Sequence, residues 1–209
     1  MDYTSIHIYG HLLSDDILHE IETDSSMQGN REQDFNLDVS LTAKVDNAWS
    51  SLRNDWKLFA ERNTLRDPYG TKSVRRLMER FFSSLDYQLD FQPAQIEAGE
   101  RRFDIPYVCP ELGQMPIIIV GDKTGDATLD TLDKCTLDQR VKGERRQKSP
   151  HATMLDYLNS TEHVYGIVTN GQVLRVIRNT GQLVKLTYIE FDLRRMIEED
   201  HYAEFCLLF

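Results

Sequence analysis

The residues best suited to chemistry follow the apolar run at residues 115–120. Gly121, Asp122 and Lys123 stand directly after it, and three more aspartates follow at intervals of three or four residues: Asp126, Asp130 and Asp133. A phosphate-binding loop with Gly121 as its second glycine would need its first where Pro116 stands, and Lys123 has no glycine before it. A calcium loop needs alternate ligands and a closing glutamate, which this spacing does not supply. A solvated acidic helix or loop therefore fits the aspartates better.

The cysteines and histidines predict no further metal site. Cys109, Cys135 and Cys206 form no close pair, so neither a disulfide framework nor a zinc ribbon can be built from them alone. They are expected to be reduced and structural. His7 and His11 have a helical spacing of four, but no cysteine or carboxylate completes a ligand set around them.

The charge balance limits the range of partners. The chain has 209 residues and a net charge of −10, which argues against a surface that is basic throughout and leaves a local basic site open. The longest strongly apolar run, residues 117–120, is far below the ~20 residues that cross a bilayer. The first residues also lack a basic and then apolar leader. No membrane partner and a cytoplasmic location are therefore expected.

Two regions with different hydrophobic patterns must position these residues. Residues 1–70 read as a helical, acidic N-terminal extension, with a helix start at Ser14 and a longer helix that buries one stripe: Leu41, Val45, Trp49, Leu52, Trp56 and Phe59. Residues 71–209 read as an α/β domain that begins with a helix near Thr71. Its mixed pattern of helices and strands predicts a central sheet flanked by helices.

The strands and helices of the second region have clear local signals. Residues 87–91 alternate as a strand does, and residues 115–120 predict a strand buried on both faces. Ser149-Pro150 predicts a helix start, and Asn170-Gly171 predicts a type I′ hairpin turn between two strands. Asp192 is expected to cap a last helix that extends to Phe205.

The order of these elements resembles the PD-(D/E)XK nucleases of the restriction-endonuclease-like fold. In that family an acid precedes an apolar strand ending Glu-x-Lys; the carboxylates hold Mg²⁺ and the lysine positions the attacking water. The resemblance implies Asp104, Asp122 and Lys123 as catalytic residues, with Asp104 and Asp122 as ligands of a Mg²⁺ cofactor. The chain departs from the pattern at Gly121, where the second acid belongs. Asp122 replaces it if the strand bulges; the other candidates are Glu97, Glu100, Glu111 and Asp126.

A second resemblance covers residues 72–209. The segments 157–171, 174–178 and 188–193 look like the N-terminal region of type IIG-like restriction and modification proteins, among them those of the BREX and DISARM phage-defence systems. There this region precedes an adenine-specific DNA methyltransferase domain, so a further domain is expected after Phe209. Because the chain has neither an Asn-Pro-Pro-Tyr motif nor a glycine-rich cofactor loop, it is not itself the methyltransferase. The implied partners are double-stranded DNA and a methyltransferase domain or subunit.

Two groups of basic residues could bind DNA next to such a nuclease site. Arg101 and Arg102 precede Asp104, and residues 140–148 carry five cations against one acid: Arg140, Lys142, Arg145, Arg146 and Lys148. They are expected to bind DNA phosphates, with an affinity that falls steeply with salt. The alternative is a solvated, flexible loop.

Three further polar residues lie in the predicted helices and strands. Arg175 and Arg178 are three apart on a strand and so point to opposite faces. One of them is expected to meet solvent or a carboxylate such as Glu190, and the other DNA. For His151 a capping or surface role is expected rather than catalysis.

Two functions therefore remain open. The first is a Mg²⁺-dependent DNA endonuclease domain of a restriction-modification or phage-defence system. The second is a catalytically inactive nuclease-like module that binds DNA or docks a methyltransferase to partner proteins through the acidic residues 1–30.

Overall fold

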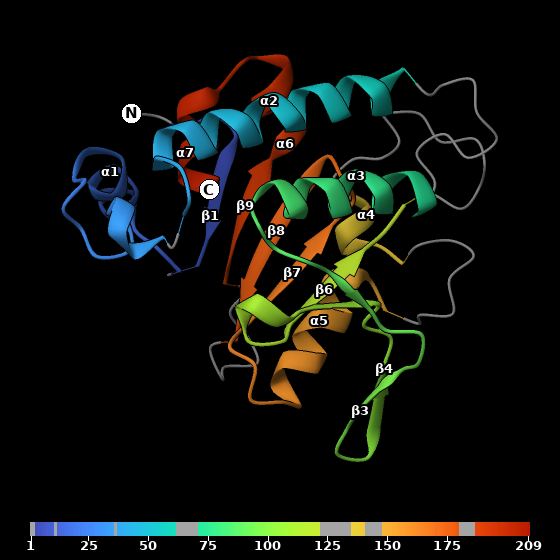
Figure 1. The fold of residues 1–209 in the computed structure, drawn as a ribbon. Helices are drawn as coiled ribbons and strands as arrows, with labels where there is room; N and C mark the ends of the chain where they lie inside the picture. Colours follow the sequence, from blue (N-terminus) through green and yellow to red (C-terminus); the bar gives the residue numbers. More distant parts are fainter. Residues whose placement is uncertain are drawn as a thin grey trace.

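A computed structural model describes residues 3–10, 12–35, 37–61, 71–121, 135–140, 148–179 and 187–209. These residues form an α/β fold in which helices cover both faces of a seven-stranded mixed sheet (Figure 1). A separate two-stranded hairpin, β3 (Ile96–Ala98) and β4 (Arg101–Phe103), projects from the body of the molecule. The expected α/β class is therefore confirmed.

The sheet runs from an N-terminal edge strand to a very short strand at the other edge. Its order is β1 (Ile6–Tyr9), β9 (Tyr188–Asp192), β8 (Val173–Arg178), β7 (Tyr165–Thr169), β6 (Met115–Ile119), β5 (Tyr107–Cys109) and β2 (Asp90–Phe91). Strands β6 and β7 are parallel, and the other neighbouring strands of this sheet pair antiparallel.

The parallel pair requires a crossover, and helices α4 (Cys135–Asp138) and α5 (Pro150–Asn159) lie within it. Helix α5 begins where the sequence predicts, because the Ser149 hydroxyl accepts a hydrogen bond from the Ala152 N–H at 3.1 Å and Pro150 occupies the first turn. Its apolar side packs on the sheet in a core that includes Ile118, Val168 and Ile177.

The opposite face of the sheet carries a larger core. Alternate residues such as Ile117 and Ile119 point into it, so β6 is buried on both faces as predicted. This face of the sheet is covered by four helices: α2 (Leu41–Ala60), α3 (Thr71–Ser84), α6 (Leu193–Glu198) and α7 (Tyr202–Leu208). Both tryptophans of α2 are buried there. Helix α1 (Asp15–Thr23) packs beside α7.

The contacts cross the predicted boundary at residue 70. Strand β1 pairs with β9 from Ile6 opposite Phe191 to Tyr9 opposite Tyr188, and α2 packs along α3. One hydrophobic core therefore joins residues from both predicted regions.

Several local predictions were wrong. The helix expected from 193 to 205 breaks into α6 and α7, and Asp200 in the break has a φ of 59°. The strand expected at 87–91 is limited to β2. The turn after β7 is not of type I′, because only Gly171 has a positive φ, of 84°, while Asn170 accepts hydrogen bonds from the N–H groups of Gln172 and Val173.

Among the residues that the structure describes, none belongs to a helix with both the length and the apolar character of a membrane span.

Candidate functional site

The predicted acid Asp104 lies at the end of the sheet to which β6 runs. Strands β5 and β6 are antiparallel, with Tyr107 opposite Ile117. Asp104 therefore precedes β5 at the same end of the sheet where Gly121 follows β6. The Asp104 side chain is half-buried. Asp122 and Lys123, the other two predicted catalytic residues, lie outside the described residues.

The glutamates considered as a second metal ligand lie elsewhere. Glu111 follows β5 at its other end, where it accepts hydrogen bonds from the Cys109 thiol and the Gln88 N–H. Glu97 lies on the projecting hairpin 3.0 Å from Arg102, and Glu100 is in the turn of that hairpin. Within the described ranges, no three His, Cys, Asp or Glu side chains are grouped closely enough to hold a metal ion.

Two of the predicted DNA-binding cations converge on one carboxylate. Arg101 of β4 lies 3.0 Å from Asp156 of α5, and Lys148, just before α5, pairs with the same side chain. Partial burial raises the pKa of Asp156, but hydrogen bonds from Lys148 and Arg101 outweigh it and hold that pKa below its usual value. Because one carboxylate serves two cations, this cluster keeps one net positive charge.

The remaining predicted cations divide into two groups. Arg102 is paired with Glu97 in an exposed ion pair, and Arg140 is exposed. Lys142, Arg145 and Arg146 lie outside the described residues, so their positions relative to Asp104 stay a prediction.

A buried network of charged side chains lies between the sheet and the crossover helices α4 and α5. The Arg175 side chain is 2% exposed, and its guanidinium lies 2.6 Å from Glu190 and 2.7 Å from Asp138. It also stacks on the Tyr188 ring, 4.2 Å from the centroid. The expected pairing with Glu190 is therefore confirmed. Arg178 lies 5.9 Å from the ring of the exposed Tyr165.

His151 belongs to this network and is only 5% exposed, so the expected surface role is wrong. Its Nδ1 lies 2.8 Å from an Arg175 nitrogen. A guanidinium has no lone pair to offer, so Nδ1 must accept and the proton must sit on Nε2. Burial, and then the Arg175 charge, lower the pKa of His151 to about 4, against an opposing effect of Asp138. Nε2 has no hydrogen-bond partner among the described residues, so the neutral ring is held through Nδ1 and by its edge-to-face contact with Tyr188 at 5.2 Å.

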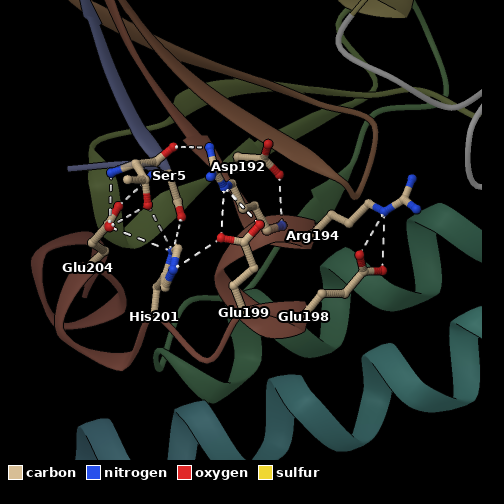
Figure 2. A network of polar contacts seen from close by, with 9 residues as sticks. Ser5, Asp192, Arg194, Glu198, Glu199, His201 and Glu204 are labelled. Carbon is tan, nitrogen blue, oxygen red and sulfur yellow. Dashed lines mark hydrogen bonds and ion pairs between the residues drawn. The ribbon is translucent and has the colours of Figure 1, made fainter. Parts of the chain in front are cut away.

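A second polar network contains a serine, a histidine and a glutamate in contact. Figure 2 shows His201 between Ser5, Glu204 and Glu199, with Nδ1 2.6 Å from the Ser5 hydroxyl and Nε2 3.3 Å from Glu199. Catalytic triads place the nucleophile on Nε2 and the acid on Nδ1, which is the reverse arrangement. Ser5 is also fully buried, so no substrate reaches its hydroxyl.

The second network instead fastens the N-terminal strand to the C-terminal helices. Glu204 of α7 accepts hydrogen bonds from the N–H groups of Thr4 and Ser5 at 3.0 and 2.7 Å. The Asp192 N–H donates to the Ser5 carbonyl at 2.8 Å. Sequence reasoning missed this network, because its partners are almost 200 residues apart and no local pattern marks them.

Comparison with protein-family models, with curated proteins and with solved structures finds no match to this chain.

Proposed function

We propose that this chain is a DNA endonuclease domain that hydrolyses phosphodiester bonds with Mg²⁺ at the end of the sheet marked by Asp104. The single observation that carries the proposal is that Asp104 and the exit of β6 lie at the same end of the sheet. The substrate is DNA in a restriction-modification or phage-defence setting, which implies a cytoplasmic location and a methyltransferase domain or subunit as partner.

The order of elements supports this proposal. An acid precedes β5, the apolar strand β6 leads to Gly121, helix α5 crosses over, and β7 returns parallel to β6. This is the order on which the resemblance to the restriction-endonuclease-like nucleases rests. The residues after Gly121 are an aspartate and a lysine, the two types that the reaction needs beside Asp104.

The donor set is sparse but meets the minimum for Mg²⁺. Proteins commonly hold this ion with one or two carboxylates plus the phosphates of the substrate. Asp104 supplies one carboxylate, and Asp122 is proposed as the second. When bound, Mg²⁺ polarises a phosphate oxygen and makes water a better nucleophile. Lys123 is proposed to stabilise the attacking oxygen, and the positive cluster of Arg101 and Lys148 to contact the DNA backbone.

A second candidate function is a nuclease-like module that binds DNA without cleaving it. One observation favours it: Gly121 stands where the family carries an acid. Loss of one carboxylate removes much of the anchoring of a hard cation.

Cleavage of a plasmid in Mg²⁺ and in EDTA separates the two candidates. The nuclease proposal predicts nicking in Mg²⁺, and Asp104→Asn should reduce its rate by more than about 100-fold, beyond the 10–100-fold effects of outer-shell changes. Lys123→Ala should have a similar effect. Asp16→Asn on α1, by the opposite edge of the sheet, is the matched control and should cleave as the wild type does. Binding of the plasmid without Mg²⁺-dependent nicking would support the inactive module.

A further inference from the structure

The first turns of α3 carry exposed cations close to the candidate site. The helix has four basic residues and one acid, in a chain with a net charge of −10, so its charge is opposite in sign to that of the whole. Lys72 and Arg76 are exposed, and neither has an ion-pair partner in the described ranges. Arg80, one turn further on, is paired with Asp55 of α2. The free positive charge therefore lies at the start of the helix.

An exposed aromatic ring lies beside a third cation of the same helix, Arg75. Phe91 of β2 is 52% exposed although it is part of the sheet. The Arg75 guanidinium lies 5.0 Å from the centroid of the Phe91 ring and 5.2 Å from that of Tyr107. Phe91 and Tyr107 meet edge to face at 5.6 Å. These contacts fix the Phe91 ring in place while leaving about half of its surface open.

This surface adjoins the end of the sheet that carries Asp104. Phe91 pairs with Tyr107, and the N–H of the next residue, Gln92, donates to the Pro106 carbonyl at 2.8 Å. The chain thus continues from Phe91 toward the end of the sheet that carries Asp104. Asp104 is three residues from Tyr107, the partner of Phe91, which is about 10 Å along an extended strand. The start of α3 packs against the turn after β7, since a Cβ added at Gly171 would lie 3.1 Å from Val74.

We propose that Phe91 and the start of α3 bind single-stranded DNA and lead an unpaired strand to the Asp104 site. This inference rests on the proposed function and adds DNA with a gap, junction or frayed end as the substrate that the site binds best. An aromatic ring fixed at the surface can stack on the open face of an unpaired base. In an intact duplex the faces of the bases are covered by their neighbours. Lys72 and Arg76 neutralise the phosphates of the same strand. A carboxylate-rich peptide would use the cations but gain nothing from Phe91.

The test is the binding of a fluorescent thymidine oligonucleotide, measured by anisotropy in EDTA so that cleavage plays no part. Phe91→Ala should weaken binding about 10-fold, within the range measured for loss of one stacked base, and Phe91→Trp should restore it. Lys72→Ala and Arg76→Ala should each reduce the slope of log affinity against log salt by about 0.7. Val164→Ala, a similarly exposed apolar residue on the approach to β7, is the control and should bind as the wild type does.

The outcomes separate this inference from the proposed function. Equal affinity for duplex and single strand, no effect of Phe91→Ala, or displacement of the oligonucleotide by polyglutamate at equal charge would each overturn the inference. If the wild type binds single strands through Phe91 but cleaves no DNA in Mg²⁺, the proposed nuclease fails and the binding surface stands.

Discussion

Replacement of Arg175 by methionine is expected to lower the free energy of unfolding by about 4 kcal/mol, because it leaves a buried carboxylate without its partner. Glu190 is 2% exposed and receives two hydrogen bonds from Arg175, at 2.6 and 3.0 Å. Asp138, the other carboxylate on the guanidinium, is 53% exposed and becomes solvated at little cost. The destabilisation should therefore come mainly from Glu190.

The double variant Arg175→Met/Glu190→Leu tests this reasoning. It removes both buried charges, and replacement of a buried pair by apolar groups is often neutral or stabilising. We expect it to recover most of the loss and to lie within about 2 kcal/mol of the wild type, because His151 Nδ1 still lacks its donor. Urea denaturation followed by fluorescence gives the values, and the single variant should melt about 12 °C lower, at roughly 3 °C per kcal/mol for a chain of this size.

An exposed pair provides the control for the buried one. Arg102 and Glu97 are 70% and 67% exposed, so Arg102→Met should cost less than about 1 kcal/mol. Two results would refute this reasoning: Arg175→Met also lowers the free energy of unfolding by less than about 1 kcal/mol, or the double variant is as unstable as the single one. Either result would mean that the unpaired Glu190 carboxylate is not the main source of the destabilisation.

Three other perturbations have defined outcomes. The pKa of His151 is about 4 in the folded protein and about 6.5 when the chain is unfolded, so between these values the unfolded chain binds one more proton. About 3 kcal/mol of stability should therefore be lost as the pH falls from 6.5 to 4. Urea titrations should show a smaller loss in His151→Gln. Gly166→Ala should cost about 1–3 kcal/mol by thermal melting, since an added Cβ would collide with Met154 Sδ, and Met154→Leu should relieve part of the cost. Burial raises the pKa of Cys109 to about 11 and also raises that of Cys206, but only Cys206 is exposed. Peptide mapping after iodoacetamide at pH 8 should therefore find Cys206 alkylated and Cys109 intact.

The elements with local signals were predicted well from the sequence. The Ser14 and Ser149 hydroxyls both accept the N–H hydrogen bonds expected of helix caps. The amphipathic stripe of α2 and the apolar run of β6 also lie where they were expected. Each of these signals arises from interactions within a few residues, which a pattern of residue types records directly.

Features that depend on distant partners escaped prediction. Strand β1 is held by β9, about 180 residues away, and no turn or crossover beside it indicates the pairing. The break between α6 and α7 depends on the left-handed Asp200, although glycine is the residue usually expected at such a φ. The predicted strand at residues 87–91 is longer than the observed β2. Alternation of residue types shows that a segment can be a strand, but not that a neighbouring strand pairs with it along its whole length.

The same distinction applies to the candidate site. The sequence named Asp104, and the antiparallel register explains why it lies beside the exit of β6. It did not predict that Arg101 and Lys148 would share Asp156, because that contact depends on how α5 crosses the sheet. Nor did it single out Phe91, whose exposure follows from its place on a two-residue edge strand.

Iron-directed cleavage of the polypeptide tests the proposed metal site most directly. Fe²⁺ in place of Mg²⁺, with ascorbate and peroxide, generates radicals that cut the backbone beside the bound ion. The proposed site predicts two cuts, near Asp104 and just after β6, which excess Mg²⁺ suppresses and which Asp104→Asn abolishes. Cuts that remain in Asp104→Asn, or that fall instead near the carboxylates around His201, would contradict the assignment of the metal to this end of the sheet.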